Sequence, residues 1–178
     1  MFRRLSVAAF ARSAAQMEGV EPLASFRRLA DGAQGDVSHA VVRWSARGEI
    51  RSPPGGFEQV WLHLVVRAGL PKICQRCLGP LEVELCVDRW FRFVADEATA
   101  AAQDEQVEED LLVLSREFDI AGLIEDELVM EMPLVPKHGQ CPLPLAPTTS
   151  ATAGDAMAGT ASDAKPNPFA VLAKLRLL

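Results

Sequence analysis

The sequence has no apolar run long enough to cross a membrane. A membrane-spanning helix needs about 20 consecutive apolar residues, and no stretch of the 178-residue chain reaches that length. The first residues lack the long apolar core of a secretory signal. They are rich in Arg, Ala and Ser and have no acidic residue before Glu18. A mitochondrial transit peptide has this composition, but so does an amphipathic helix of a cytosolic protein. We expect the second, and hence a cytoplasmic protein without a membrane partner.

Cysteine is also scarce. Four cysteines in a chain of this length are too few for the disulfide framework that stabilises small secreted domains. The apolar fraction of 49% is sufficient for a hydrophobic core without such bonds. We therefore expect a reducing compartment, in which the cysteines are free or bound to a metal.

The common sets of catalytic residues are missing. The sequence has no glycine-rich phosphate-binding loop and no GxSxG nucleophile motif. Its three histidines are far apart, and His39 and His63 lie in strand-like sequence, where structural roles are expected. Asp126 and Glu127 are expected on the solvent-facing side of a helix rather than as an acid and base pair. These absences predict a protein that is not an enzyme and has no small-molecule substrate.

The negative charge is confined to one block. The formal net charge is −6, yet residues 1–95 carry 13 Lys or Arg against 9 Asp or Glu. Residues 96–131 carry 1 against 13, and residues 132–178 carry 4 against 2. The distribution of charge therefore says more about partners than its average.

Hydrophobic periodicity predicts an α+β core domain over residues 1–141. Apolar residues three and four apart predict a helix over residues 5–16, and Pro22 is expected to begin a second helical turn. Asp119 is a typical N-cap, and an amphipathic helix is expected from there to Met132, where prolines follow.

Alternation of apolar and polar residues predicts strands between these helices. Three strands with short connections form an antiparallel meander, and they span residues 37–51, 57–70 and 81–94. A fourth, short strand is expected over residues 111–114. Breaks in the alternation at Gly48 and after Arg89 indicate bulges. Cys86 is expected to pack as a small apolar residue in the third strand.

Three further segments are assigned from composition. The acidic, Ala- and Gln-rich residues 96–110 predict a solvated loop. Residues 142–164, rich in Pro, Ala, Thr, Ser and Gly, predict a flexible linker. Residues 165–178 predict a C-terminal amphipathic helix, with Asn167 as N-cap and Pro168 at the first helical position.

Two short stretches carry metal-ligating side chains. Cys74 and Cys77 have the spacing that lets one tight turn present both sulfurs to a tetrahedral ion, and His138 and Cys141 can complete a zinc set. A structural turn without metal is the main alternative. A redox pair is a third, although such a pair is expected at the start of a helix, whereas a strand follows here.

Basic and aromatic residues accompany the predicted strands. A sheet with such side chains can bind RNA through phosphate contacts and base stacking. An ordinary sheet with Trp in its core and Arg in water fits the same pattern. The residues are Arg43, Arg47, Arg51, Arg67, Lys72, Arg76, Arg89 and Arg92, with Trp44, Trp61, Trp90 and Phe91.

Three motifs follow one another along the chain. The first is Cys74-Gln75-Arg76-Cys77-Leu78-x-Pro80. The second joins Glu125-Asp126-Glu127-Leu128 to Met132-Pro133-Leu134-Val135-Pro136-Lys137-His138. The third, and the most specific, is Lys165-Pro166-Asn167-Pro168-Phe169-Ala170-Val171-Leu172-Ala173-Lys174-Leu175. Together they resemble the YceD family, the bacterial large ribosomal RNA subunit accumulation proteins, which have relatives in chloroplasts.

The resemblance implies a non-catalytic role in the synthesis, processing or stability of 23S rRNA during ribosome biogenesis in the bacterial cytosol. Some family members carry further cysteine pairs after the helix that look like a fuller zinc site. This chain has only His138 and Cys141 there. This departs from the fuller site of those members, but with Cys74 and Cys77 it still leaves four potential ligands, Cys74, Cys77, His138 and Cys141, and zinc is the expected cofactor.

The expected partner is 23S rRNA or its precursor, contacted directly or indirectly. In a direct contact, Lys72, Arg76 and Lys137 are expected to bind phosphate around the cysteine turn. The acidic block is expected to prevent indiscriminate RNA binding or to bind a basic ribosomal protein. The alternative is an adaptor that binds a protein through the acidic loop and the terminal helix, and affects rRNA only indirectly.

Overall fold

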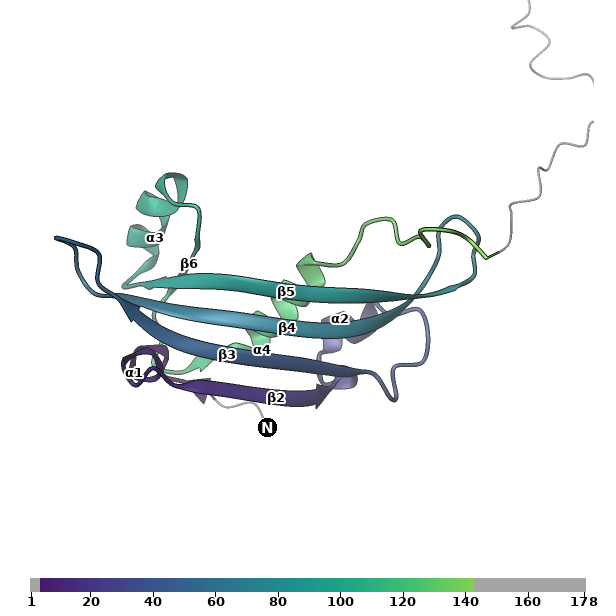
Figure 1. Cartoon of the computed structure of the whole chain (residues 1–178), viewed down its shortest axis with the longest axis horizontal. Helices are drawn as coiled ribbons and strands as arrows, with labels where there is room; N and C mark the ends of the chain where they lie inside the picture. Colours follow the sequence, from purple (N-terminus) through teal and green to yellow (C-terminus); the bar gives the residue numbers. More distant parts are fainter. Residues whose placement is uncertain (1–3, 143–178) are drawn as a thin grey trace, which may run out of the picture. The chain divides into compact units, whose positions relative to one another are not determined.

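The protein is built on a five-stranded sheet with the order β2-β3-β4-β5-β6 (Figure 1). The computed structural model describes residues 4–142. Neighbouring strands from β2 to β5 are antiparallel, and β6 pairs with β5 in parallel. The α+β class and the meander are therefore confirmed, with a parallel edge strand added. The strands are β2 (Gln16–Pro22), β3 (Val41–Arg51), β4 (Gln59–Ile73), β5 (Pro80–Val94) and β6 (Asp110–Val113).

The predicted linker, apart from its first residue, and the predicted C-terminal helix lie outside the described residues. Within residues 4–142, no helix has the length and apolar character needed to cross a membrane.

Helices cover one face of the sheet and enclose the core. These are α1 (Val7–Arg12), the 3-10 turn η1 (Leu23–Ser25), α2 (Arg27–Asp31) and α4 (Ile120–Met130). Alternate residues of a strand point to opposite faces, so Leu62, Leu64 and Val66 of β4 enter the core while His63 and Arg67 point away from it. The second face carries charged and polar side chains together with Trp61 and Trp90, and we call it the open face.

The pairing of β3, β4 and β5 is continuous, so both predicted bulges are wrong. Gly48 pairs with Leu62 in regular register and instead allows close approach of α1, because a Cβ there would lie 2.7 Å from the Ala11 Cα. Trp90 breaks the apolar alternation because it lies on the open face, where its ring stacks on His63 at a centroid distance of 4.4 Å.

The N-terminal region contains a strand that the periodicity did not predict. The predicted helix over residues 5–16 is confined to α1, which is followed by Ala14 in a left-handed conformation with φ of 47°. The edge strand β2 follows. The apolar alternation of β2 is weak because Gly19, rather than a residue with an apolar side chain, faces the core. There it lies against the Trp44 indole.

The acidic block is partly helical, which corrects the predicted loop. The helix α3 (Glu97–Gln103) begins at Asp96, whose side chain accepts a hydrogen bond from the Thr99 N–H at 2.7 Å. The 3-10 turn η2 (Asp104–Gln106) leads to β6, which confirms the fourth predicted strand. A separate two-stranded sheet pairs β1 (Arg4–Leu5) with β7 (Phe118–Asp119).

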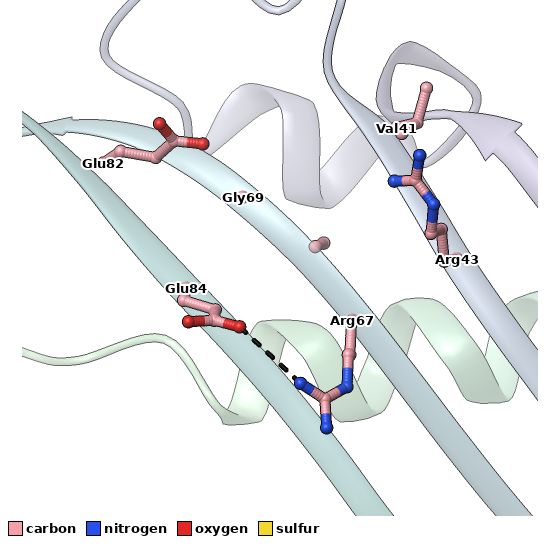
Figure 2. Close-up of a pocket in the computed structure, with 7 residues that line it drawn as sticks. Val41, Arg43, Arg67, Gly69, Glu82 and Glu84 are labelled. Atoms are coloured by element: carbon pink, nitrogen blue, oxygen red, sulfur yellow. Dashed lines mark ion pairs between the residues drawn. The ribbon is translucent and has the colours of Figure 1, made fainter.

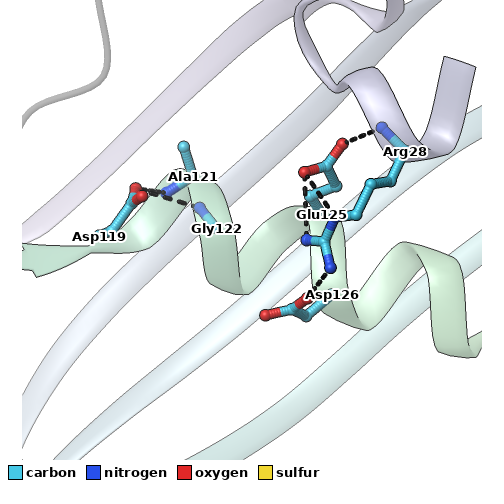
Figure 3. A network of polar contacts seen from close by, with 6 residues as sticks. All are labelled: Arg28, Asp119, Ala121, Gly122, Glu125 and Asp126. Carbon is cyan, nitrogen blue, oxygen red and sulfur yellow. Dashed lines mark hydrogen bonds and ion pairs between the residues drawn. The ribbon is translucent and has the colours of Figure 1, made fainter.

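The helix α4 begins where the sequence predicted. The Asp119 carboxylate accepts hydrogen bonds from the N–H groups of Ala121 and Gly122, at 3.0 and 3.1 Å. Figure 3 shows this cap beside Arg28, which joins α2 to α4 through Glu125 and Asp126. Arg28 Nη1 lies 2.6 Å from the Asp126 carboxylate.

Glu127 was expected in solvent but is 7% exposed. It points to the sheet, where its carboxylate lies 3.4 Å from Arg89 Nη1. Burial raises the pKa of Glu127, while Arg89 acts in the opposite direction. A buried carboxylate of this kind needs its cation, so this ion pair attaches α4 to β5.

Replacement of Asp119 by Ala is expected to lower the free energy of unfolding by about 1 kcal/mol, because two N–H groups lose their acceptor. Urea unfolding of both proteins measures the difference. Asp119→Asn is the matched control, since Asn caps almost equally well. Equal losses for both variants would contradict a capping role.

Replacement of Gly48 by Ala is expected to cost about 1–3 kcal/mol, because the new methyl group overlaps the backbone of α1. Thermal unfolding measures the effect as a lower Tm. Gly139→Ala is the control, since a Cβ at that position meets nothing within 4 Å. An unchanged Tm for Gly48→Ala would show that α1 moves away from the sheet without cost.

Candidate metal centre

The turn between β4 and β5 holds Cys74 and Cys77. Backbone hydrogen bonds close it, from the Cys74 N–H to the Gly79 carbonyl and from the Leu78 N–H to the Cys74 carbonyl, both at 2.9 Å. Leu78 has a φ of 58°, in the left-handed region that favours glycine. The tight reversal imposes this conformation on Leu78. This geometry directs both sulfurs to the same side of the turn.

The chain that follows α4 returns to this turn and brings the other two ligands. The Gln75 N–H donates to the Pro136 carbonyl at 2.8 Å. Arg76 Nη2 donates to the His138 carbonyl at 2.7 Å. These contacts join two segments that are about 60 residues apart in the sequence, as the paired motifs predicted.

The four predicted metal ligands lie together. One ligand atom from each of Cys74, Cys77, His138 and Cys141 lies within 4.8 Å of all the others. The Sγ atoms of Cys74 and Cys141 are 3.9 Å apart, and Cys77 Sγ is 3.4 Å from His138 Nδ1. Zinc bonds of about 2.3 Å to sulfur and about 2.0 Å to nitrogen require tetrahedral edges of about 3.5–3.8 Å. The set therefore fits a tetrahedral ion.

The His138 imidazole is oriented so that one ring nitrogen can bind a metal. His138 Nε2 lies 3.0 Å from the Pro80 carbonyl oxygen, so Nε2 carries the proton and Nδ1 is free to bind a metal. A metal-bound histidine usually donates its other N–H to such an oxygen.

Hydrogen-bond donors surround the sulfurs and favour the thiolate that a metal requires. Burial raises the pKa of the Cys74 thiol, but the backbone N–H groups of Cys77, His138 and Arg76 outweigh burial and lower it to about 5. The Arg76 Nε–H donates to Cys141 Sγ at 3.0 Å.

The pKa of Cys77 is shifted in the opposite direction. The Gly79 N–H lowers its pKa, but burial and the neighbouring thiols of Cys141 and Cys74 raise it overall. The neighbouring sulfurs thus disfavour a negative charge on Cys77, and a bound divalent cation would offset this repulsion.

The three predicted phosphate-binding residues differ in their surroundings. Lys72 Nζ donates to the Gly32 carbonyl at 2.7 Å, and Arg76 is held by Cys141 and His138. Lys137 is exposed and, within residues 4–142, makes no ion pair. Lys72 therefore joins the end of β4 to the end of α2, and Arg76 joins the turn to the segment after α4.

Cys86 does not belong to the centre. It is exposed on the open face, with Sγ 3.6 Å from a Glu84 carboxylate oxygen, so the prediction of a packed residue is wrong. The sequence signal was available, since Cys86 shares its strand face with Glu84 and Asp88 rather than with Leu85 and Val87.

The basic and aromatic residues of the strands separate into two groups. Arg89 faces the core side and pairs with Glu127 and Asp110, and Arg92 is 7% exposed beside Glu109, so carboxylates already pair with both. The second group lies on the open face. It consists of Arg43, Arg47, Arg51, Arg67, Trp61 and Trp90.

Comparison with known proteins gives the family. The family described as "Large ribosomal RNA subunit accumulation protein YceD" matches residues 62–176. A curated Haemophilus influenzae protein of that name is 33% identical over 120 residues, which cover 64% of this chain and 66% of the relative. The match thus spans just under two thirds of that relative's length. No solved structure matches the chain. The matched residues include the cysteine turn, α4 and the returning segment, and the chain belongs to the YceD family.

Proposed function

We propose that this protein is a non-catalytic factor of large-subunit biogenesis, acting in the cytoplasm to support the synthesis, processing or stability of 23S rRNA. Family membership carries this proposal, because the family is named for the accumulation of large-subunit rRNA. The described residues favour binding over catalysis. His63 is stacked on Trp90 and bonded to Asp88 at 2.6 Å, and His138 lies in the metal centre.

The metal in this proposal is zinc, in a structural role. A complete Cys₃His set leaves no open position for substrate, which is typical of structural rather than catalytic zinc. The ion would join the end of the β4–β5 hairpin to the segment after α4. It would therefore hold Lys137 beside the turn that carries Arg76.

Direct RNA contact in this proposal involves Lys72, Arg76 and Lys137. Lys137 is the strongest candidate for a phosphate contact, because its side chain is exposed and has no carboxylate partner among the described residues. Arg76 is partly occupied by Cys141 and the His138 carbonyl, so its guanidinium would serve the metal centre and phosphate together.

A protein-binding adaptor is the second candidate, and one observation favours it. A hollow of about 540 Å³ between β6 and α4 has apolar residues such as Leu112, Leu123 and Met130 beside Asp104 and Asp126. Met130 is 72% exposed. Its charged lining has four carboxylates, Asp104, Asp110, Asp126 and Glu127, against Arg28 and Arg89. Apolar contacts inside a rim of net negative charge suit a basic ribosomal protein.

Protein purified without chelator is expected to contain one zinc per chain by elemental analysis. Cys77→Ser is expected to lose the zinc and lower the Tm, because one ligand of the closed set is removed. Cys86→Ser is the matched control and should keep both zinc and Tm, since Cys86 lies outside the centre. Wild-type protein with less than one zinc per several chains would contradict the metal site.

Crosslinking in growing cells, with sequencing of bound RNA and identification of bound proteins, tests the proposed function. Enrichment of 23S rRNA or its precursor over a control without crosslinking is the expected result. Lys137→Ala should reduce this enrichment, whereas Arg12→Ala, an exposed arginine on α1, should not. Crosslinks to ribosomal proteins without 23S rRNA would instead establish the adaptor.

A further inference from the structure

A hollow of about 500 Å³ lies on the open face where β3, β4 and β5 run side by side (Figure 2). Arg43 and Arg67 line one side of it, and Glu82 and Glu84 line the other. None of these side chains takes part in the core, the metal centre or the attachment of a helix. The hollow is therefore a polar site that the fold itself does not explain.

The two arginines face each other in the sheet. Arg43 and Arg67 are direct partners in the β3–β4 register, and like charges in this position destabilise a sheet. Arg67 reaches Glu84 only at 3.8 Å, with side chains that are 68% and 73% exposed. Such a pair contributes little. Arg43 makes no ion pair within the part of the chain that the structure describes, so both guanidinium groups are available to an anion.

The floor of the hollow is Gly69, in the interior of the central strand. A glycine there weakens a strand and often marks the close approach of a ligand. Glu82 lies over Gly69, since a Cβ at this position would collide with the Glu82 carboxylate. The absence of a side chain at Gly69 thus makes room for the Glu82 carboxylate beside the two arginines.

The two guanidinium groups and two carboxylates of the hollow favour some anionic ligands over others. Guanidinium groups bind phosphate oxygens, often through two parallel hydrogen bonds. Carboxylates repel a bare phosphate but accept hydrogen bonds from the amino and imino groups of bases and from the ribose 2′-hydroxyl. The hollow therefore suits a nucleotide better than an inorganic anion.

A second hollow of about 550 Å³ adjoins the first and shares Gly69 and Glu82 with it. Its other lining residues include Asp36, Lys72 and Pro80. Lys72 Nζ donates to the Gly32 carbonyl, and the Pro80 carbonyl accepts a hydrogen bond from His138 Nε2. The two hollows thus form a path along the sheet from Arg43 to Pro80, the residue whose carbonyl contacts the candidate ligand His138.

We propose that this path binds single-stranded RNA, with one nucleotide in the first hollow. Arg43 and Arg67 bind its phosphate, and Glu82 and Glu84 accept hydrogen bonds from its base and ribose. The proposal rests on direct contact with rRNA, as in the proposed function, and extends that contact from the turn to the sheet.

The salt dependence of RNA binding tests this site. Titrations of the zinc-loaded full chain with a single-stranded 23S rRNA oligonucleotide give the slope of log K against log salt concentration. This slope is negative, and each lost phosphate contact reduces its magnitude by about 0.7 for a single strand. The double variant Arg43→Ala/Arg67→Ala is expected to have a smaller slope and roughly tenfold weaker binding.

Arg12→Ala/Arg27→Ala is the matched control, because both residues are exposed, lie on helices of the covered face and make no ion pair within residues 4–142. It changes the net charge equally and should bind like wild type. Arg43→Lys/Arg67→Lys should keep the slope but lose affinity, since lysine cannot form the bidentate contact. Unchanged melting temperatures establish that each variant is folded.

Two outcomes separate this site from the proposed function. Wild-type protein that binds no RNA would overturn direct rRNA contact, and the hollow with it. Wild-type binding with an arginine double variant that matches the control would overturn the hollow alone. Uridine monophosphate is expected to bind far more weakly than the oligonucleotide, and equal affinity would contradict a site for an RNA strand.

Discussion

The continuous pairing of β4 with β5 is the constraint on which the rest of this structure depends. These two 15-residue strands keep one register from Val60 and Phe93 to Ile73 and Pro80. At about 3.4 Å per residue, each extends about 50 Å. Because side chains alternate without a bulge, this single register decides which residues enter the core and which stay on the open face. It also places the cysteine turn at one end of the hairpin, whereas residues 96–110 follow the opposite end, after Val94.

The two ends of the hairpin are stabilised by different chemistry. At the turn, three thiols and an imidazole meet, and Arg76 adds a compensating positive charge. At the other end, aromatic and cationic side chains form a stack in which Arg51 lies 4.0 Å from the Trp90 ring centroid and 4.2 Å from that of Trp61. This stack occupies the Trp side chains that base stacking would need, so it stabilises the sheet rather than offering a platform for RNA.

Arginines of the sheet and of α2 neutralise part of the acidic block. Arg28, Arg89 and Arg92 each pair with carboxylates of residues 96–131. The pairs Arg28–Asp126 and Arg89–Asp110 are exposed and individually weak. The buried members Glu127 and Arg92 make the Arg89–Glu127 and Arg92–Glu109 pairs the exceptions. The basic residues of the chain therefore have two tasks: some hold the acidic segment to the sheet, and others face solvent at the hollow and the turn. A chain with a net charge of −6 can therefore still present exposed basic residues, which suits a member of a family named for rRNA accumulation.

Local sequence pattern by itself determined several features. Strands β3 to β6, the Asp119 cap, the apolar face of α4 and the convergence of Cys74 and Cys77 with His138 and Cys141 all follow from spacing, periodicity or donor chemistry. Each of these signals is carried by neighbouring residues or by side chains with a strong common preference. The tertiary structure alone decided the edge strand β2, the parallel pairing of β6, the burial of Glu127 and the meeting of Arg43 with Arg67. These depend on the register between separate strands and on what packs across a face, and short-range periodicity contains neither.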